Sequence, residues 1–427
     1  MSGRLRRKTT AAQARIGKSN KAIRRRTKRF GLLPAVVSAL GAGVLVAFLA
    51  YQVVHGVAQP DDQAKAAPID IAKVALAIVA GVGGVVALVI AYRRQRDAEQ
   101  GRFVERFGAA AAQLGATDVA VRIAGVYAMA RAADEADGLH RQQCIDVLCG
   151  YLRLPYDAVH GTSGRTKFVV KEPRIEHGRV RGETEEHVEY RQNDSEVRKT
   201  IVRVIADRLR PEAEYSWSAS DFDFRTAHLE DVDLRHATFA GDARFDEARF
   251  TGGAWFDKAR FTGDAWFDKA TFTGDAWFNE ATFTGDAWFN EATFVGGAWF
   301  TEATFTGDAG FTEVRFTGGA WFNEARFTGD AWFNTATFTG GAWFTEATFT
   351  GDAGFNTATF TGDAGFNEVM FAGKSSFVAA DFGSGRIAFI EPRQWGPPPP
   401  EFDWGEDGRR KPSNVEPQIW PPVTAAP

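Results

Sequence analysis

The stretch that decides the fold reads Phe272-Thr-Gly-Asp-Ala-Trp-Phe-Asn-Glu-Ala-Thr282, after which Phe283 begins the next unit. Phenylalanine recurs at alternating spacings of six and five residues from Phe239 to Phe382. Fourteen phenylalanines fall in one series, which starts at Phe239, and thirteen fall in the other, which starts at Phe245. The repeating unit is therefore the stretch from Phe272 to Thr282, and self-similarity at such a fixed period predicts a solenoid.

Each half of the unit places a small residue two positions before a large one, as in Ala265 and Phe267 or Ala270 and Phe272. Residues two apart on an extended strand share a face, so each short face buries one alanine and one phenylalanine before a turn follows. The predicted core ladder includes Phe245, Phe250, Phe256, Phe261, Phe267, Phe272, Phe278, Phe283, Phe289, Phe294, Phe300 and Phe305.

The first units of the repeat are shorter and carry a recognisable signature. Ala227-His-Leu-Glu-Asp, Val232-Asp-Leu-Arg-His and Ala237-Thr-Phe-Ala-Gly resemble the A-(D/N)-L-x-x pattern of the pentapeptide-repeat family. The resemblance implies a right-handed, quadrilateral β-helix over residues 216–390. The later units depart from strict fives, because a sixth residue falls in a Gly-Asp or Gly-Gly pair such as Gly263 and Asp264. We expect these glycines to supply a positive φ at a widened corner.

A second, longer period, twice the length of the repeating unit, supports a coil with four sides. Residues that recur at this period are the aspartates Asp242, Asp264, Asp286, Asp308, Asp330 and Asp352, and the tryptophans Trp255, Trp277, Trp299, Trp321 and Trp343. Two units would then make one turn, with equivalent residues stacked ~4.8 Å apart. The stretch from Phe224 to Phe382 predicts about seven turns.

The five tryptophans just named precede inward phenylalanines and so face outward. An exposed aromatic surface is a candidate binding site. The alternative is a stacked ladder whose role is to stiffen the rod.

Two charge-free stretches, Phe30–Tyr51 and Val74–Tyr92, are each long enough to cross a bilayer as a helix. We therefore predict that residues 30–92 form a transmembrane helical hairpin. Residues 1–29 form a basic arm, and Arg93, Arg94 and Arg96 follow the second stretch, whereas the connecting loop carries one lysine and three aspartates. By the positive-inside rule both termini and the repeats are cytoplasmic. We expect the bacterial cell (inner) membrane, with the lipid bilayer as one partner.

Residues 93–210 predict short amphipathic helices, with apolar stripes that include Ile123, Val126, Tyr127 and Ala130. Part of this region resembles a helical module of bacterial membrane proteins that also carry pentapeptide repeats, and the resemblance implies HEAT-like helix pairs. Tyr156–Asp194 is polar and predicts a long loop with scattered histidines. Cys144 and Cys149 lie five apart in a helical stretch, which fits a reducing compartment better than a disulfide.

No catalytic, cofactor or metal site is predicted, because the solenoid aspartates lie in a column instead of converging on one pocket. The proline-rich residues 391–427 predict a disordered tail. The sequence favours a non-enzymatic rod that binds or scaffolds an unknown protein partner, and it leaves self-association open.

Two alternatives remain. A branch of the pentapeptide-repeat family resembles duplex DNA and protects DNA gyrase. The 8 Lys+Arg against 20 Asp+Glu between Ala237 and Phe382, a net charge of -12, fits such a topoisomerase-binding mimic. The predicted membrane tether and the tryptophan columns do not fit it, and binding of nucleic acid itself is not expected. The other alternative is an enzyme or regulator that acts through the helical middle region.

Overall fold

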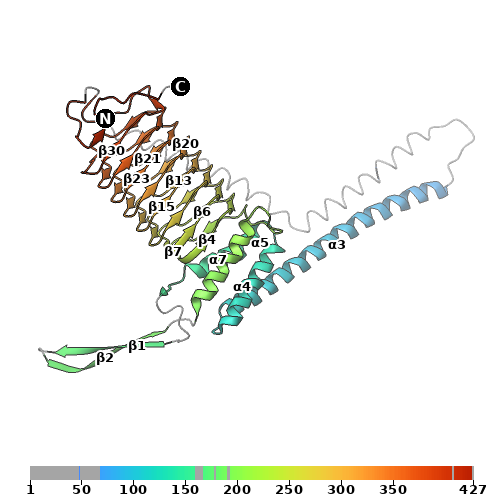
Figure 1. Ribbon diagram of the computed structural model, residues 1–427. Coiled ribbons are helices and arrows are strands. Elements are labelled where there is room, and N and C mark those ends of the chain that lie inside the picture. Colours follow the sequence, from blue (N-terminus) through green and yellow to red (C-terminus); the bar gives the residue numbers. More distant parts are fainter. Residues whose placement is uncertain are drawn as a thin grey trace, which may run out of the picture. The chain divides into compact units, whose positions relative to one another are not determined.

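The computed structural model describes residues 48, 68–158, 167–176, 179–189, 193–405 and 408–425 (Figure 1). The chain divides into two compact units, residues 1–102 and 103–427. Helix α3 (Pro68–Leu114) begins in the first unit and runs without a break past Tyr92, where the sequence predicted that a membrane span ends.

The predicted transmembrane hairpin is not supported by this structure. Its first span, Phe30–Tyr51, lies outside the described residues apart from Phe48, as does the basic arm 1–29. Its second span, Val74–Tyr92, falls within α3. Over the part of the chain that the structure describes, no helix was found that is both long enough and apolar enough to cross a membrane.

The helices predicted for the middle region are present as α4 (Val119–Asp134), α5 (Gly138–Leu152) and α7 (Asp194–Leu209). Asp118 starts α4 by accepting the backbone N–H of Ala120 at 2.7 Å, which satisfies a donor that the first helical turn leaves unpaired. The prediction that Tyr127 belongs to the buried stripe is wrong, since 48% of this residue is exposed. The buried face of α4 is instead formed by Val126, Met129, Ala130 and Ala133.

The loop predicted for Tyr156–Asp194 contains a β-hairpin. Strands β1 (Lys167–Glu176) and β2 (Arg179–Glu189) pair antiparallel, with Lys171 opposite Glu185. The Nζ atom of Lys171 lies 2.7 Å from Oε1 of Glu185, and such cross-strand pairs of opposite charge stabilise a hairpin. The many charges of this segment suggested a loop because their pairing across two strands could not be seen in the sequence.

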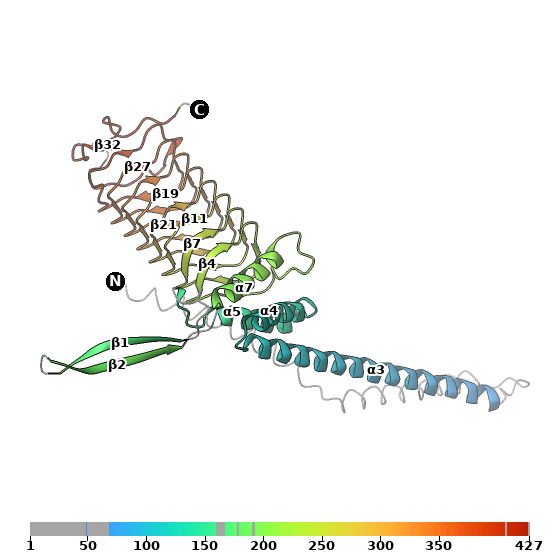
Figure 2. The same cartoon turned by 60° about the horizontal axis from the view of Figure 1, so that its bottom comes forward.

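The repeats form a β-solenoid of about eight turns, one more than the sequence predicted (Figures 1 and 2). The added length comes from strands that precede Phe224 and follow Phe382. Equivalent residues of neighbouring coils pair in parallel, as Thr271 does with Thr293 and Phe272 with Phe294. A coil of two repeat units is thus confirmed, while its handedness stays a prediction.

Four ladders of short strands make the four sides. Side A consists of β4 (His228–Asp233), β7 (Arg249–Trp255), β10 (Thr271–Phe272), β14 (Thr293–Phe294), β18 (Arg315–Phe316), β22 (Thr337–Phe338) and β26 (Thr359–Phe360). Side B shares β4 and β7 and continues with β11 (Ala276–Trp277), β15 (Ala298–Trp299), β19 (Ala320–Trp321), β23 (Ala342–Trp343), β27 (Ala364–Gly365), β30 (Ile387–Ala388) and β32 (Val415–Glu416).

The other two sides contain eight strands each. Side C consists of β5 (Thr238–Phe239), β8 (Arg260–Phe261), β12 (Thr282–Phe283), β16 (Thr304–Phe305), β20 (Arg326–Phe327), β24 (Thr348–Phe349), β28 (Met370–Phe371) and β31 (Gln394–Trp395). Side D consists of β3 (Phe222–Asp223), β6 (Ala243–Arg244), β9 (Ala265–Trp266), β13 (Ala287–Trp288), β17 (Ala309–Gly310), β21 (Ala331–Trp332), β25 (Ala353–Gly354) and β29 (Ser375–Ser376).

The glycines of the Gly-Asp pairs have a different role from the one expected. The left-handed backbone lies three residues after each outward tryptophan position, as at Lys269 (φ 58°) and Glu280 (φ 54°), and not at Gly263 or Gly285. Glycine is required there because the coils approach closely: a Cβ on Gly285 would lie 2.5 Å from the carbonyl oxygen of Gly263. Of the glycines in these pairs, Gly252 alone has a positive φ, 74°.

The tail 391–427 was predicted to be disordered, but its described residues cap the end of the solenoid. The last coils would otherwise expose Phe377 and Phe389. The Phe402 ring stacks on Phe377 at 4.8 Å, and the Trp420 ring meets Phe402 edge-on at 5.1 Å. Proline content suggested disorder, whereas the aromatic residues spaced through this tail supply an apolar cover.

Candidate binding surface

The most regular exposed feature is a column of tryptophans on side B. Strands β7, β11, β15, β19 and β23 place them one coil apart, each half-buried and directed outward between an inward alanine and an inward phenylalanine. The rings are nearly parallel, with centroids 5.2 Å apart for Trp255 and Trp277, and 4.7 Å apart for Trp299 and Trp321. The five predicted candidates Trp255, Trp277, Trp299, Trp321 and Trp343 therefore lie on one side of the solenoid.

Local sequence explains how these rings lie. The Trp299 ring folds back along its strand, so that a Cβ on Gly297 would be 2.8 Å from Cζ2 of the indole. Glycine at this slot, two residues before the tryptophan, leaves room for the ring. At the end of the column Trp343 lies against Gly365, whose Cβ would be 3.0 Å from the Cε3 atom of Trp343.

A column of glutamates runs beside the tryptophans, and sequence analysis missed it. It occupies the left-handed corner three residues after the tryptophans from Trp277 onward, as at Glu302 (φ 58°) and Glu324 (φ 57°). After Trp255 the same corner is occupied by Lys258, whose Nζ atom lies 3.3 Å from Oε1 of Glu280. Its signal in the sequence was a glutamate recurring once per coil. The column consists of Glu280, Glu302, Glu324, Glu346, Glu368 and Glu391.

The residues between the two columns are engaged with one another. Asn279 donates its amide to Asp257 Oδ1 at 2.8 Å, and Asn323 Oδ1 accepts the backbone N–H of Thr345 at 3.2 Å. Glu280 lies 3.3 Å from Lys258 and Glu346 lies 4.0 Å from Arg393. The tryptophan rings and the carboxylates of Glu302 and Glu324 are thus the groups that this surface offers most directly to a partner. We refer to the column of outward tryptophans on side B, from Trp255 to Trp343, together with the column of glutamates from Glu280 to Glu391, as the Trp–Glu face.

The aspartate column that revealed the coil length has a structural role. Carboxylates of this column accept the backbone N–H of the residue one coil further on, at 3.0 Å from Asp286 to Asp264, 3.1 Å from Asp330 to Asp308 and 3.0 Å from Lys374 to Asp352. Burial, followed by repulsion from Asp221 and Asp264, raises the pKa of Asp242 above its ordinary value. These carboxylates replace missing backbone acceptors at a corner, and none is directed into a pocket with a second catalytic group.

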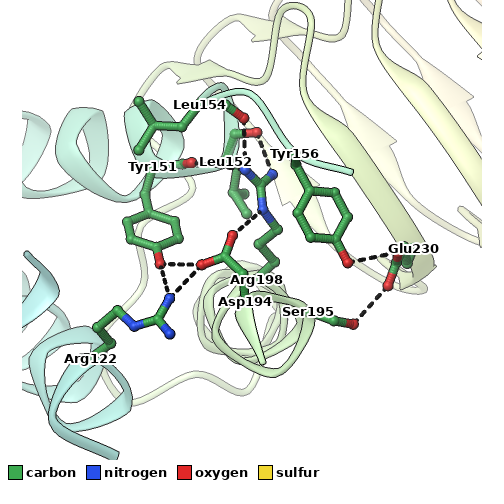
Figure 3. Close-up of polar contacts among 9 residues, drawn as sticks. All are labelled: Arg122, Tyr151, Leu152, Leu154, Tyr156, Asp194, Ser195, Arg198 and Glu230. Atoms are coloured by element: carbon green, nitrogen blue, oxygen red, sulfur yellow. Dashed lines mark hydrogen bonds and ion pairs between the residues drawn. The ribbon is translucent and has the colours of Figure 1, made fainter. Parts of the chain in front are cut away.

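A buried polar cluster closes the other end of the solenoid (Figure 3). Arg122 of α4 is fully buried, and its Nη1 atom donates to Asp194 Oδ1 at 2.6 Å and to the Tyr151 hydroxyl at 3.0 Å. Arg198 Nε donates to the other oxygen of Asp194 at 2.9 Å. The guanidinium of Arg198 also donates to the carbonyl of Leu152 at 2.8 Å. The cluster joins α4, α5 and α7, and every charged member has a partner of opposite sign.

Further contacts fasten these helices to the first coils. Glu230 of β4 accepts hydrogen bonds from the Tyr156 hydroxyl at 2.9 Å and the Ser195 hydroxyl at 2.8 Å. Gln142 of α5 pairs through its amide with both backbone groups of Asp221, at 2.7 and 2.9 Å. The helices thus provide hydrogen-bond partners for polar groups at the edge of the solenoid, which would otherwise be open to pairing with another chain.

The polar cluster offers little to a reaction. The cavity beside Arg198, His228 and Glu230 measures about 10 Å³, room for roughly one water molecule. Burial raises the pKa of Cys144 to about 11 and that of Cys149 to about 12, so both thiols stay protonated near neutral pH. No group of three or more candidate metal ligands was found among the residues that the structure describes.

A larger cavity of about 650 Å³ lies in the C-terminal cap, bounded by Trp395, Trp420, Pro399 and the side chains of Lys374 and Ser375. It is lined mainly by apolar atoms of the cap and the last coils. The aromatic cover described above therefore packs loosely on one side.

The comparison with protein families agrees with the geometry of the coils. A family described as pentapeptide repeats, in nine copies, matches residues 224–271, 267–315 and 311–359. Together these cover about a third of the chain. No curated protein and no solved structure matches the chain significantly. The repeat region is thus similar to pentapeptide repeats and folds as a β-solenoid that suits a binding or scaffolding role.

Proposed function

We propose that the protein is a non-enzymatic scaffold that binds a protein partner on the Trp–Glu face. The observation that carries the proposal is the pairing of two uninterrupted columns, stacked indoles and exposed carboxylates, on neighbouring positions of successive coils. Tryptophan is enriched in protein interfaces because it contributes a large contact area with few rotatable bonds. The carboxylates favour a partner whose surface is basic.

The glutamates are not required by the fold. The equivalent corner between sides D and A has the same left-handed backbone but is occupied by Glu247, Lys269, Glu291, Glu313, Thr335, Thr357 and Ala379. Like charges placed opposite one another on neighbouring strands are destabilising. A column of glutamates ~4.8 Å apart therefore lowers stability where other residues would serve. This supports selection for binding over selection for folding.

Mimicry of DNA is supported less well. The net charge of -12 over Ala237–Phe382 is spread along ~32 Å of solenoid, or one charge per ~2.7 Å. Duplex DNA carries one per about 1.7 Å of its axis. The protruding indoles also interrupt the acidic surface, which a phosphate backbone does not do.

Photo-crosslinking tests the binding face. A photoreactive amino acid at Thr301, between the two columns, should crosslink one defined protein in the cells that make this chain. The same amino acid at the exposed Thr284, beside side C, is the matched control. Equal crosslinking from both positions, or none from Thr301, would argue against the proposal.

We also propose that residues 30–92 anchor the protein in the bacterial inner membrane with the repeats in the cytoplasm. Support comes from the two charge-free stretches and their basic flanks. In α3, Leu88 and Ile90 are exposed by 72% and 56%, which is unusual for a helix meant to face water. A reporter that is active only outside the cytoplasm, fused after Pro427, should stay silent while the protein resists extraction with carbonate. Reporter activity would refute the orientation, and release by carbonate would refute the anchor.

A further inference from the structure

A second column of tryptophans, on side D, is interrupted by one glycine that has a tryptophan on both sides. Gly310 pairs with Trp288 in the preceding coil and with Trp332 in the following one. Glycine also takes the outward tryptophan position at Gly354 and Gly365, but these residues lie where a tryptophan column ends. Among the described strands, only Gly310 separates two tryptophans.

The two rings face each other across this gap. Trp288 and Trp332 are parallel to within 7°, with their centroids 6.3 Å apart. Their backbones are two coils apart, ~9.6 Å, so the rings lean toward one another over Gly310. A Cβ on Gly310 would lie 2.5 Å from Cε3 of Trp288 and 2.9 Å from Oδ1 of Asn290. The Trp288 ring thus leans into the space that a side chain at position 310 would occupy, and it covers the buried Gly310. We refer to the gap between the two indole walls, with Gly310 as its floor, as the slot.

The centroid spacing of the two rings, 6.3 Å, is slightly smaller than a planar group between them requires. Contact with both walls requires about 7 Å, twice a carbon contact distance of ~3.5 Å. The rings need to separate by about 0.7 Å, and this movement returns them toward the spacing of their own backbones. Indoles in direct contact lie closer, as Trp255 and Trp277 do at 5.2 Å.

The surroundings of the slot are acidic. Asp308 precedes Gly310 by two residues, and Asp286 and Asp330 occupy the same corner in the coils on either side. Each uses one carboxylate oxygen for the backbone ladder, as Asp308 does toward Asp330 at 3.1 Å, and the ladder does not require the other oxygen. The opposite corner carries Glu313 and Glu291, and Oε1 of Glu291 lies 3.7 Å from Nζ of Lys269.

We propose that the Trp288–Gly310–Trp332 slot binds the guanidinium group of an arginine side chain from a protein partner. A guanidinium is planar, stacks on aromatic faces and donates to carboxylates in a fixed fork, whereas a lysine ammonium does not stack. The chain already uses this pairing in the same column, where Arg244 lies over the Trp266 ring at 4.7 Å. The slot lies on side D and does not depend on the Trp–Glu face of side B.

The test uses fluorine NMR of the full chain labelled with 5-fluorotryptophan. The chain has 12 tryptophans, and each gives its own fluorine resonance. A blocked Gly-Arg-Gly tripeptide should shift the resonances of Trp288 and Trp332, assigned with Trp288→Leu and Trp332→Leu. Blocked peptides with lysine or the uncharged isostere citrulline should bind at least about fivefold more weakly. Gly310→Trp fills the slot with an indole, as the continuous column on side B does, and should abolish the shifts. Gly365→Trp, on side B, is the matched control and should leave them unchanged.

Equal binding of the lysine peptide, or a folded Gly310→Trp variant that still binds, would overturn the proposal. If Gly310→Trp does not fold by circular dichroism, the two leucine variants decide: each should weaken binding at least about fivefold, and unchanged affinity in both refutes the slot. Tighter binding of free arginine than of the blocked peptide would refute a protein side chain as the occupant.

Discussion

Each inward phenylalanine is held between identical rings in the coils above and below it. Phe300 is fully buried, and its centroid is 4.8 Å from those of Phe278 and Phe322, with the rings within 3° of parallel. Burial of one such ring contributes roughly 1.5–3 kcal/mol before conformational entropy is subtracted. Because every coil repeats the arrangement, the loss of one ring removes packing contacts in three successive coils.

Phe300→Asp should therefore destabilise the solenoid by several kcal/mol, because it replaces a ring that is stacked on two others with a carboxylate that has no partner in the core. Thr306→Asp, at an exposed corner one coil side away, should change the free energy of unfolding by less than about 0.5 kcal/mol. Urea denaturation of both variants measures the difference. Similar midpoints for the two would mean that the phenylalanine series does not form the core.

Among the elements, the helices α4, α5 and α7 act as the cap of the first coils, and Asp194 is the centre of that cap. It is 6% exposed and lies between the guanidinium groups of Arg122 and Arg198. A buried charge that loses its partner is far more costly than a surface pair that is broken.

Asp194→Ala should lower the free energy of unfolding by about 3–5 kcal/mol, because it removes the carboxylate that two buried guanidinium groups share. Asp207→Ala, which breaks only the exposed pair with Arg210, is the matched control and should cost under about 0.5 kcal/mol. Thermal unfolding of the two variants tests this difference. A small effect of Asp194→Ala would mean that the helices do not stabilise the solenoid.

The coil is the unit by which the solenoid can be shortened. Deleting Phe261–Thr282 removes one whole coil and leaves all four sides in register. Repeat stability depends mainly on neighbouring coils, so this variant should stay folded and be shorter by ~4.8 Å. Deleting Phe261–Thr271 removes half a coil, turns the later coils by half a turn and interrupts the Trp–Glu face. Solution scattering measures the length, and loss of folding in the whole-coil deletion would contradict the independence of the coils.

For the whole molecule, the strongest predictions came from the parts of the sequence that repeat, although the repeating glutamates were missed. The phenylalanine spacing and the Asp and Trp columns predicted the solenoid and the length of its coil, because the same residue type recurs at the same position in many coils. The polar cluster of Arg122 and Asp194 joins residues 72 positions apart and has no periodic signal. The aromatic cap of Phe402 and Trp420 was hidden by prolines, whose local preference for irregular backbone does not reveal what the chain packs against.

The Trp–Glu face was half visible in the sequence. Trp299 and its equivalents were identified as outward, since alternation along a strand fixes direction. The neighbouring glutamates were overlooked because their importance comes from the corner geometry: a left-handed residue is held away from the core and stacks in line with its equivalents. Only the structure shows that the matching corner on the other side tolerates threonine at Thr335 and Thr357.

The most direct test of the Trp–Glu face is the double variant Glu302→Thr and Glu324→Thr, measured for both thermal stability and crosslinking from Thr301. Threonine is accepted in the same left-handed conformation at Thr335 and Thr357, and the change removes repulsion between stacked carboxylates. We predict a melting temperature that is unchanged or higher, together with loss of the crosslinked partner. A melting temperature lowered by several degrees with crosslinking retained would show that the glutamates serve folding, and would contradict the assignment of this face to binding.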